Sequence, residues 1–182
     1  MVASAEYIQR LLRVKTDPWY FLSNCVFTLD QADKAAPVKR FPKDGAMGPY
    51  LKLYTKVWQN YPRVVVPKSR RMFMTWVNVS LYLWDTMWNI GRHNAFVSKK
   101  EEDANELIKK AKFIADNIPQ DFLPRELIPQ YEVTYCKMTF AGTSSLLQGF
   151  PQGEDQLRQF TLSGILADEM AFWEKADRKS VV

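Results

Sequence analysis

At 182 residues, the chain is long enough for one domain with a substantial core, or for a domain with a small appendage. Apolar residues make up 47% and charged residues 25%, which is an ordinary globular balance. The net charge of +5 is uneven, because residues 1–100 hold 16 Lys and Arg against 6 Asp and Glu, while residues 101–182 hold 9 against 14. A basic first half favours an anionic partner such as a nucleotide or nucleic acid, and a solvated basic face explains it equally well.

The scarcity of cysteine and histidine excludes several classes of site. Two cysteines far apart in the sequence, Cys25 and Cys136, with no signal peptide, indicate reduced thiols in a cytosolic protein. The one histidine, His93, nearly excludes histidine-based zinc sites, and any catalytic triad would have to use it. His93 lies in a helix-to-strand connection, where we expect a solvated loop residue.

Regular elements alternate along the chain. The apolar spacing predicts helices at Tyr7–Val14, from Asp17-Pro18, and at Tyr50–Tyr61, Met72–Gly91 and Lys99–Asn117. Strands are expected at Val26–Leu29, Val64–Val66, Ala95–Ser98, Glu132–Ala141 and Leu162–Ala167, with loops at Asp30–Gly48 and Gly149–Gln159. Phe73–Ile90 is strongly apolar, but Asn78, Asp85 and Asn89 interrupt it, so a buried helix is favoured over a membrane span. Strands alternating with helices predict an α/β domain with a mostly parallel sheet flanked by helices.

A basic turn lies between a valine run and a long helix. Val64–Val66 predicts a short strand that Pro67 ends, and Lys68, Arg70 and Arg71 follow before the helix. Strand, basic turn and helix is the layout of a phosphate-binding loop. Of the usual G-x-x-x-x-G-K-[ST] pattern only the hydroxyl survives, at Thr75, and a basic turn capping a core helix is the alternative.

An acidic pair ends the last predicted strand, in Ser163-Gly164-Ile165-Leu166-Ala167-Asp168-Glu169. Two carboxylates at the tip of a buried strand suit nucleoside-triphosphate hydrolysis, because one can hold Mg²⁺ and the other can orient the attacking water. By itself the pattern equally fits a strand that runs into an acidic helix start.

Taken together, these stretches resemble the ATPase domain of the large terminase subunit of tailed bacteriophages. The resemblance covers roughly Tyr50 to Trp173 and rests on four stretches in order: Val66–Trp76, Phe96–Ala104, Gly149–Arg158 and Leu166–Trp173. It implies a P-loop NTPase-type, ASCE-like sheet that stops after the Walker B strand. It also implies an N-terminal extension over residues 1–48 and an incomplete ATPase core over residues 49–182, without the family's nuclease domain. We therefore expect a fragment or a truncated reading frame.

The resemblance also assigns roles to single residues. Lys68 would be the loop lysine that reaches the β- and γ-phosphates, and Thr75 would bring a hydroxyl to Mg²⁺. Asp168 would be the second metal-binding residue and Glu169 the catalytic carboxylate. Nucleotide binding would also use the rest of the loop, whose residues are Ser69, Arg70, Arg71, Met72, Phe73 and Met74.

Two arginines match catalytic positions of the family. Arg70 matches a loop arginine that contacts or senses phosphate. Arg158 matches an arginine proposed to reach a neighbouring subunit's site, where a guanidinium stabilises charge on the transferring phosphoryl group. An ordinary surface salt bridge is the alternative for Arg158.

Besides ending soon after Trp173, before the family's coupling motif and nuclease domain, the sequence departs from the family at two places. Phe73 stands where a glycine normally lets the backbone approach the phosphates closely. The family's adenine-reading glutamine has no counterpart, because Pro49-Tyr50 is followed by Leu51, and Gln59 is a weak substitute.

The resemblance thus implies Mg²⁺-dependent ATP hydrolysis that moves double-stranded viral DNA into a procapsid, in the host cytoplasm and away from membranes. By resemblance, the partners are the portal protein, the small terminase subunit and further copies of the chain in a ring, so an isolated subunit should turn over slowly. One alternative is a non-catalytic nucleic-acid-binding or scaffold domain with a decayed nucleotide site, which the basic, aromatic-rich first half supports. Another is a helicase-like ATPase.

Overall fold

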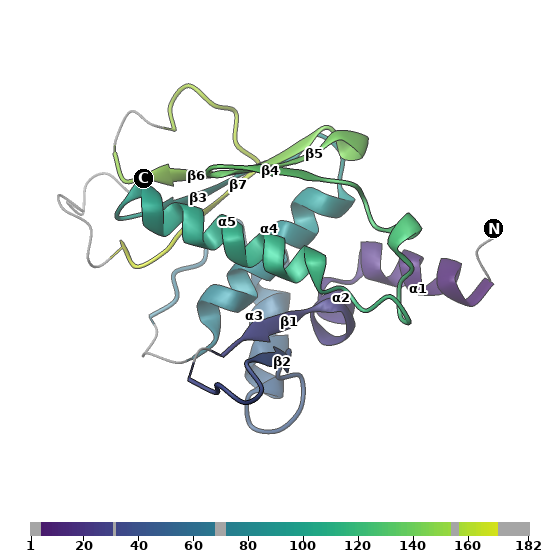
Figure 1. Ribbon diagram of the computed structural model, residues 1–182. Coiled ribbons are helices and arrows are strands. Elements are labelled where there is room, and N and C mark those ends of the chain that lie inside the picture. Colours follow the sequence, from purple (N-terminus) through teal and green to yellow (C-terminus); the bar gives the residue numbers. More distant parts are fainter. Residues whose placement is uncertain (1–4, 31, 68–71, 154–156, 171–182) are drawn as a thin grey trace. The chain divides into compact units, whose positions relative to one another are not determined.

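The computed structural model describes residues 5–30, 32–67, 72–153 and 157–170 (Figure 1). The helices are α1 (Ala5–Thr16), α2 (Pro18–Cys25), α3 (Gly48–Asn60), α4 (Met74–Trp88) and α5 (Glu101–Asp116), with short 3-10 turns η1 (Arg125–Leu127) and η2 (Ala141–Thr143). The strands are β1 (Phe27–Leu29), β2 (Val38–Arg40), β3 (His93–Ser98), β4 (Glu132–Thr134), β5 (Lys137–Phe140), β6 (Ser145–Pro151) and β7 (Gly164–Ala167). The chain forms two compact units, Met1–Trp84 with Phe113–Ile128, and Asp85–Lys112 with Pro129–Val182.

The first unit is mainly helical. As predicted, α2 begins at Pro18, and the Asp17 side chain caps it by accepting a hydrogen bond from the Tyr20 N–H at 3.1 Å. The indole of Trp84, on α4, donates to the Val14 carbonyl at the end of α1 at 2.7 Å. The Tyr54 hydroxyl, on α3, donates to Asn78 Oδ1 on α4 at 2.5 Å. Polar side chains therefore link α1 and α3 to α4 at defined points.

The second unit is built on a sheet with the strand order β4-β5-β6-β3-β7 among the described residues. β3 pairs with β6 and β7 in parallel, whereas β4–β5 and β5–β6 are antiparallel. The predicted α/β class is confirmed. The sheet is mixed rather than mostly parallel, because two of its four pairings in this part of the chain are antiparallel.

Helix α5 and a loop segment cover opposite faces of this sheet. Gly149 lies so close to α5 that an added Cβ would come within 3.2 Å of Ala104 Cβ. On the other face, Phe150 packs with Ala95 and Val97, against the partly buried Leu157, Phe160 and Leu162. Figure 1 shows α5 beside the strands. The central strand β3 is buried on both faces, which explains the uninterrupted apolar run Ala95–Val97 within it.

The predicted strand at Val64–Val66 is wrong. These residues lie in an irregular segment, and Val65 is 91% exposed. β-branched residues favour a strand only where neighbouring strands accept their hydrogen bonds and pack against them. The run is also bracketed by Pro62 and Pro67, which cannot donate to a ladder.

Two predicted element boundaries in the second unit are also wrong. Glu132–Ala141 is a hairpin of β4 and β5 rather than one strand, and Cys136 adopts φ 54° at its reversal. The loop predicted from Gly149 begins later, because β6 continues to Pro151 and buries Phe150. Both errors concern residues whose hydrogen-bond partners lie on a neighbouring strand, which the local pattern does not reveal.

His93 is not a solvated loop residue. It is the first residue of β3, and its ring packs edge-on against Phe160, with ring centroids 5.3 Å apart. Burial lowers the pKa of His93, and the nearby charge of Lys137 lowers it further, although a hydrogen bond with Gln148 acts in the opposite direction. The residue therefore belongs to the packed face of the sheet.

Both cysteines are free and buried, as expected for reduced thiols. Burial raises the pKa of the Cys25 thiol to about 12. Within the described ranges, no helix combines the length and apolarity needed to cross a bilayer. The predicted boundary between an extension and a core at residue 48 stays a prediction.

Candidate functional site

The basic turn reaches the described structure at Met72 and Phe73, since Lys68, Ser69, Arg70 and Arg71 lie outside the described residues. Phe73 adopts φ 59°, in the left-handed region. Its carbonyl accepts the first helical hydrogen bond of α4, from the Val77 N–H at 3.0 Å. Phe73 therefore occupies the turn position directly before the helix. This is the position at which the phosphate-loop pattern has its second glycine.

The first turn of α4 contains the next two predicted residues. Met74 is buried and Thr75 is half-buried. The first N–H groups of any α-helix lack acceptors within the helix, and together with the helix dipole they favour an anion at that end. Met74 and Thr75 thus lie where a phosphate-binding helix would present its backbone.

Helix α3, which belongs to the same unit, contacts this turn. The Tyr50 hydroxyl donates to the Met72 carbonyl at 3.0 Å, and burial raises the pKa of Tyr50. Pro49-Tyr50 is the stretch compared with the family's adenine-reading segment, and its hydroxyl lies within hydrogen-bonding distance of the residue before Phe73. Gln59 is exposed near the other end of α3.

The acidic pair follows a strand, as predicted. β7 pairs with β3 in the register Phe96↔Leu166 and Val97↔Ala167. The Asp168 N–H donates to the Val97 carbonyl at 2.9 Å, so the ladder holds the backbone up to Asp168. Asp168 is half-buried and Glu169 is exposed. Two carboxylates are thus presented at the carboxyl end of a parallel strand pair.

Strained backbone falls on both predicted motifs. Four non-glycine residues in the described part of the chain have positive φ, and two of them, Cys136 and Ser144, lie in short chain reversals. The others are Phe73 and Glu169, at 59° and 52°. The left-handed conformation costs a residue with a Cβ about 1–2 kcal/mol. Such outliers gather at functional sites, which makes these two informative.

Arg158 lies in an exposed turn between β6 and β7. The neighbouring Leu157 and Phe160 pack onto the sheet and anchor this turn. Arg158 is therefore exposed at the surface of the second unit, beside residues that pack onto the sheet.

Within the described ranges, no three histidine, cysteine, aspartate or glutamate side chains gather into a metal-binding group. Thr75, in the first unit, has a hydroxyl, and Asp168, in the second unit, has a carboxylate. Each is an oxygen donor of the kind that Mg²⁺ prefers.

One feature of the first unit was missed by the sequence analysis. Two adjoining hollows of about 600 and 370 Å³ share Trp19, Ser23 and Lys52, and we call them together the α2/α3 groove. The only sequence signals are Trp19 and Ser23 four residues apart on α2, and the regular spacing of Lys52, Lys56 and Gln59 on α3.

Neither the protein-family models nor the curated proteins contain a match to this chain. The resemblance to terminase ATPase domains therefore stays a hypothesis that rests on the four motifs and their order.

Proposed function

We propose that this chain is an ATP-hydrolysing module of a viral DNA-packaging motor, with a P-loop NTPase-type core. The observation that carries the proposal is the backbone of Phe73, which has φ 59° directly before α4. That conformation is natural for glycine, and glycine is what a phosphate-binding loop has at this position. The backbone therefore fits the predicted loop, although the side chain departs from it.

In the proposed site, the basic turn binds the triphosphate. Lys68, Arg70 and Arg71 supply positive charge, with Lys68 reaching the β- and γ-phosphates. Backbone N–H groups from Ser69 to Met74 complete the cradle, and the N-terminal end of α4 adds its dipole. Tyr50 holds the carbonyl of Met72 and so positions the turn.

The acidic pair performs the hydrolytic step. Glu169 orients and polarises a water whose oxygen attacks the γ-phosphorus, and the bond to the β–γ bridging oxygen breaks to release ADP and phosphate. When bound, Mg²⁺ would neutralise charge on the β- and γ-phosphate oxygens. Thr75 and Asp168 would hold that ion through oxygen ligands.

The proposed motor is an assembly. Arg158, on its exposed turn, would reach a neighbouring copy of the chain and stabilise charge on the transferring phosphoryl group, as arginine fingers do. A homo-oligomeric ring would then act on double-stranded DNA with the portal protein and the small terminase subunit, in the host cytoplasm. The ATPase rate per subunit should rise with protein concentration, and a flat rate up to the assembled state would count against this role of Arg158.

Nucleotide binding is tested by thermal unfolding with and without a non-hydrolysable Mg-ATP analogue. At 100 times the Kd, binding stabilises the folded state by about 2.7 kcal/mol. Lys68→Ala should weaken this effect, and Lys34→Ala, which removes an exposed lysine of the first unit, should not.

Catalysis is tested separately by ATP turnover. Glu169→Gln should keep the stabilisation by nucleotide and slow hydrolysis about 100- to 10,000-fold, since it removes the group that activates water. The matched control Glu132→Gln changes an exposed carboxylate on β4 and should leave turnover unchanged.

The second candidate is a nucleic-acid-binding or scaffold domain with a decayed nucleotide site. The Phe73 side chain favours it, because a Cβ and a ring stand where the loop needs close backbone approach. No thermal shift at millimolar nucleotide would select this candidate. A helicase-like ATPase would bind nucleotide equally and would be distinguished by strand separation.

A further inference from the structure

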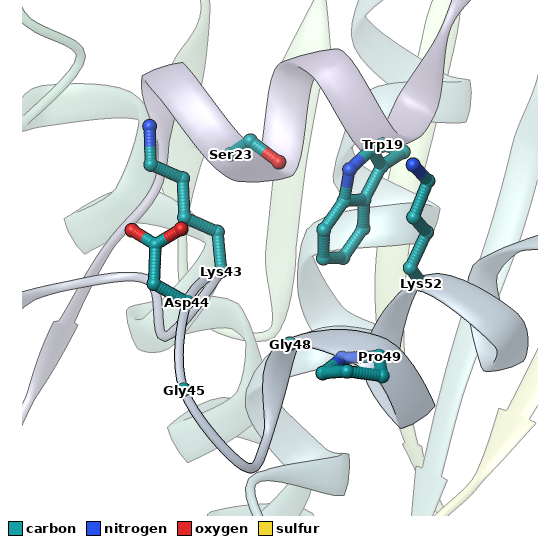
Figure 2. Close-up of a pocket in the computed structure, with 8 residues that line it drawn as sticks. All are labelled: Trp19, Ser23, Lys43, Asp44, Gly45, Gly48, Pro49 and Lys52. Carbon is teal, nitrogen blue, oxygen red and sulfur yellow. The ribbon is translucent and has the colours of Figure 1, made fainter.

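The α2/α3 groove lies within the first unit and is lined by the end of α1, by α2, by the loop before α3 and by α3 as far as Gln59. Figure 2 shows Trp19 and Ser23 projecting from α2 and Lys52 rising from α3, with Lys43 and Asp44 on the loop. The larger hollow measures about 600 Å³ and the adjoining one about 370 Å³. Ligand sites in proteins have volumes of roughly 300–1,000 Å³, so the groove is large enough for a small ligand or part of a polymer.

Positive charge dominates the lining. In the part of the chain that the structure describes, Lys43, Lys52 and Lys56 are exposed and form no ion pair. Two carboxylates also line the groove: Asp17 accepts the capping hydrogen bond of α2, and Asp44 is exposed on the loop beside Lys43. With Arg13, four cationic side chains face these two carboxylates. The three ammonium groups are therefore available to an anion.

The groove also contains an aromatic ring and a buried hydroxyl. The half-buried Trp19 contacts Phe41 in an edge arrangement, with ring centroids 6.0 Å apart and planes at 78°. Ser23 Oγ is buried and has no hydrogen-bond partner among the described residues, and Figure 2 shows it directed into the hollow. Buried polar groups are nearly always satisfied, so an unsatisfied hydroxyl at this place indicates a missing polar partner.

We propose that the α2/α3 groove binds single-stranded nucleic acid. Lys43, Lys52 and Lys56 contact successive phosphates, an unstacked base lies against Trp19, and a polar atom of that nucleotide satisfies Ser23. Cations that follow a backbone beside an aromatic platform are the usual means of binding single strands. A duplex suits the groove less well, because its bases are stacked on one another and cannot offer a face to Trp19.

This proposal does not depend on ATP hydrolysis, and its test uses no nucleotide. The full chain is titrated into fluorescently labelled oligo-dT of 20 nucleotides and into the matched duplex, with anisotropy as the readout over a series of salt concentrations. The oligo-dT should bind more tightly than the duplex. Lys52→Gln/Lys56→Gln should reduce the slope of log K against log salt by about 1.4, since each lost phosphate contact on a single strand removes about 0.7.

The matched control is Lys34→Gln/Lys100→Gln, which lowers the net charge equally at exposed lysines outside the groove. It should leave the slope unchanged. Trp19→Leu should weaken oligo-dT binding about 5- to 150-fold, as expected for loss of one base–aromatic stack, while Trp19→Phe retains most of the affinity. Thermal unfolding of each variant confirms that the first unit is folded.

Equal slopes for the groove variant and its control would overturn the proposal, because binding would then depend on net charge alone. Tighter binding of the duplex, with the same loss in Lys52→Gln/Lys56→Gln, would also overturn it and would make the groove a double-strand site. Full competition by polyglutamate at matched ionic strength would show that an acidic protein is the better occupant.

Discussion

The sequence predicts a short strand before each of the two segments, the basic turn and the acidic pair, and among the described residues the structure has one only before the acidic pair. The acidic segment follows β7, which is hydrogen-bonded to β3, and the ladder reaches Asp168. The basic segment follows Val64–Val66, which is irregular and has Val65 almost fully exposed. The acidic segment is therefore held by a sheet. Of the basic segment, the described residues Met72 and Phe73 are held by Tyr50 and by the start of α4.

This difference shows what a short apolar run needs in order to become a strand. Ala95–Val97 and Val64–Val66 are both short apolar runs, and only the first lies between two parallel neighbours. Long-range pairing, rather than β propensity, decides between them.

The largest difference in the free energy of unfolding is expected between truncations in the two apolar runs, Ala95–Val97 and Val64–Val66. Phe96→Ala removes a fully buried ring from the central strand and should lower the free energy of unfolding by about 3–5 kcal/mol. Val65→Ala should change it by less than about 0.5 kcal/mol. Urea unfolding measures both, and a similar loss for the two variants would mean that the valine run is packed after all.

Relief of backbone strain should be similar in both segments. Phe73→Gly should be more stable than Phe73→Ala by about 1 kcal/mol, because loss of the Cβ relieves about 1–2 kcal/mol and the extra entropy of the unfolded chain offsets part of this. Glu169→Gly and Glu169→Ala should differ in the same direction. Thermal or urea unfolding gives the difference.

A control position on α3 should show the opposite order of stability between its glycine and alanine variants. Leu53 is exposed in the helix interior, and its glycine variant should be about 1 kcal/mol less stable than its alanine variant. If, as at Leu53, the alanine variant were more stable than the glycine variant at positions 73 and 169, these two turns would be unstrained.

Loss of the hydrogen bond to the basic turn should have a smaller effect. Tyr50→Phe removes the contact with the Met72 carbonyl and should lower stability by about 0.5–1.5 kcal/mol. It should also weaken nucleotide binding several-fold if the turn binds phosphate. Tyr61→Phe is the matched control, since Tyr61 is 62% exposed, and it should leave both quantities unchanged.

The smallest expected effect is a difference in pH dependence between the two units. Burial raises the pKa of Tyr54 to about 12, so its stabilising contribution is complete below pH 10 and is lost as the pH rises toward 12. Burial lowers the pKa of His93 below 6.5, so its contribution is present above that pH and is lost as the pH falls. Unfolding of Tyr54→Phe should depend less on alkaline pH, and unfolding of His93→Phe less on acid pH, than unfolding of the parent.

The sequence was sufficient for elements whose signals are local. The capped start of α2, the helical spacing of α3 and α5, and the apolar core of β3 were all predicted within a few residues. Elements defined by distant partners were not, as Val64–Val66 and the β4–β5 hairpin show. For the candidate site, the residue types could be predicted from the sequence. The positive φ angles of Phe73 and Glu169 could not, and only the structure shows them. The α2/α3 groove was missed because its lining comes from three separate segments.

The central claim is that the basic turn and the acidic pair act on one magnesium-bound nucleotide. A double-mutant cycle of Thr75→Val and Asp168→Asn, read as the Kd of a fluorescent Mg-ATP analogue, tests it most directly. Ligands of one ion should show a coupling energy of about 0.5–3 kcal/mol, which disappears when Mg²⁺ is removed. Effects that add to within about 0.5 kcal/mol in the presence of Mg²⁺ would contradict the account.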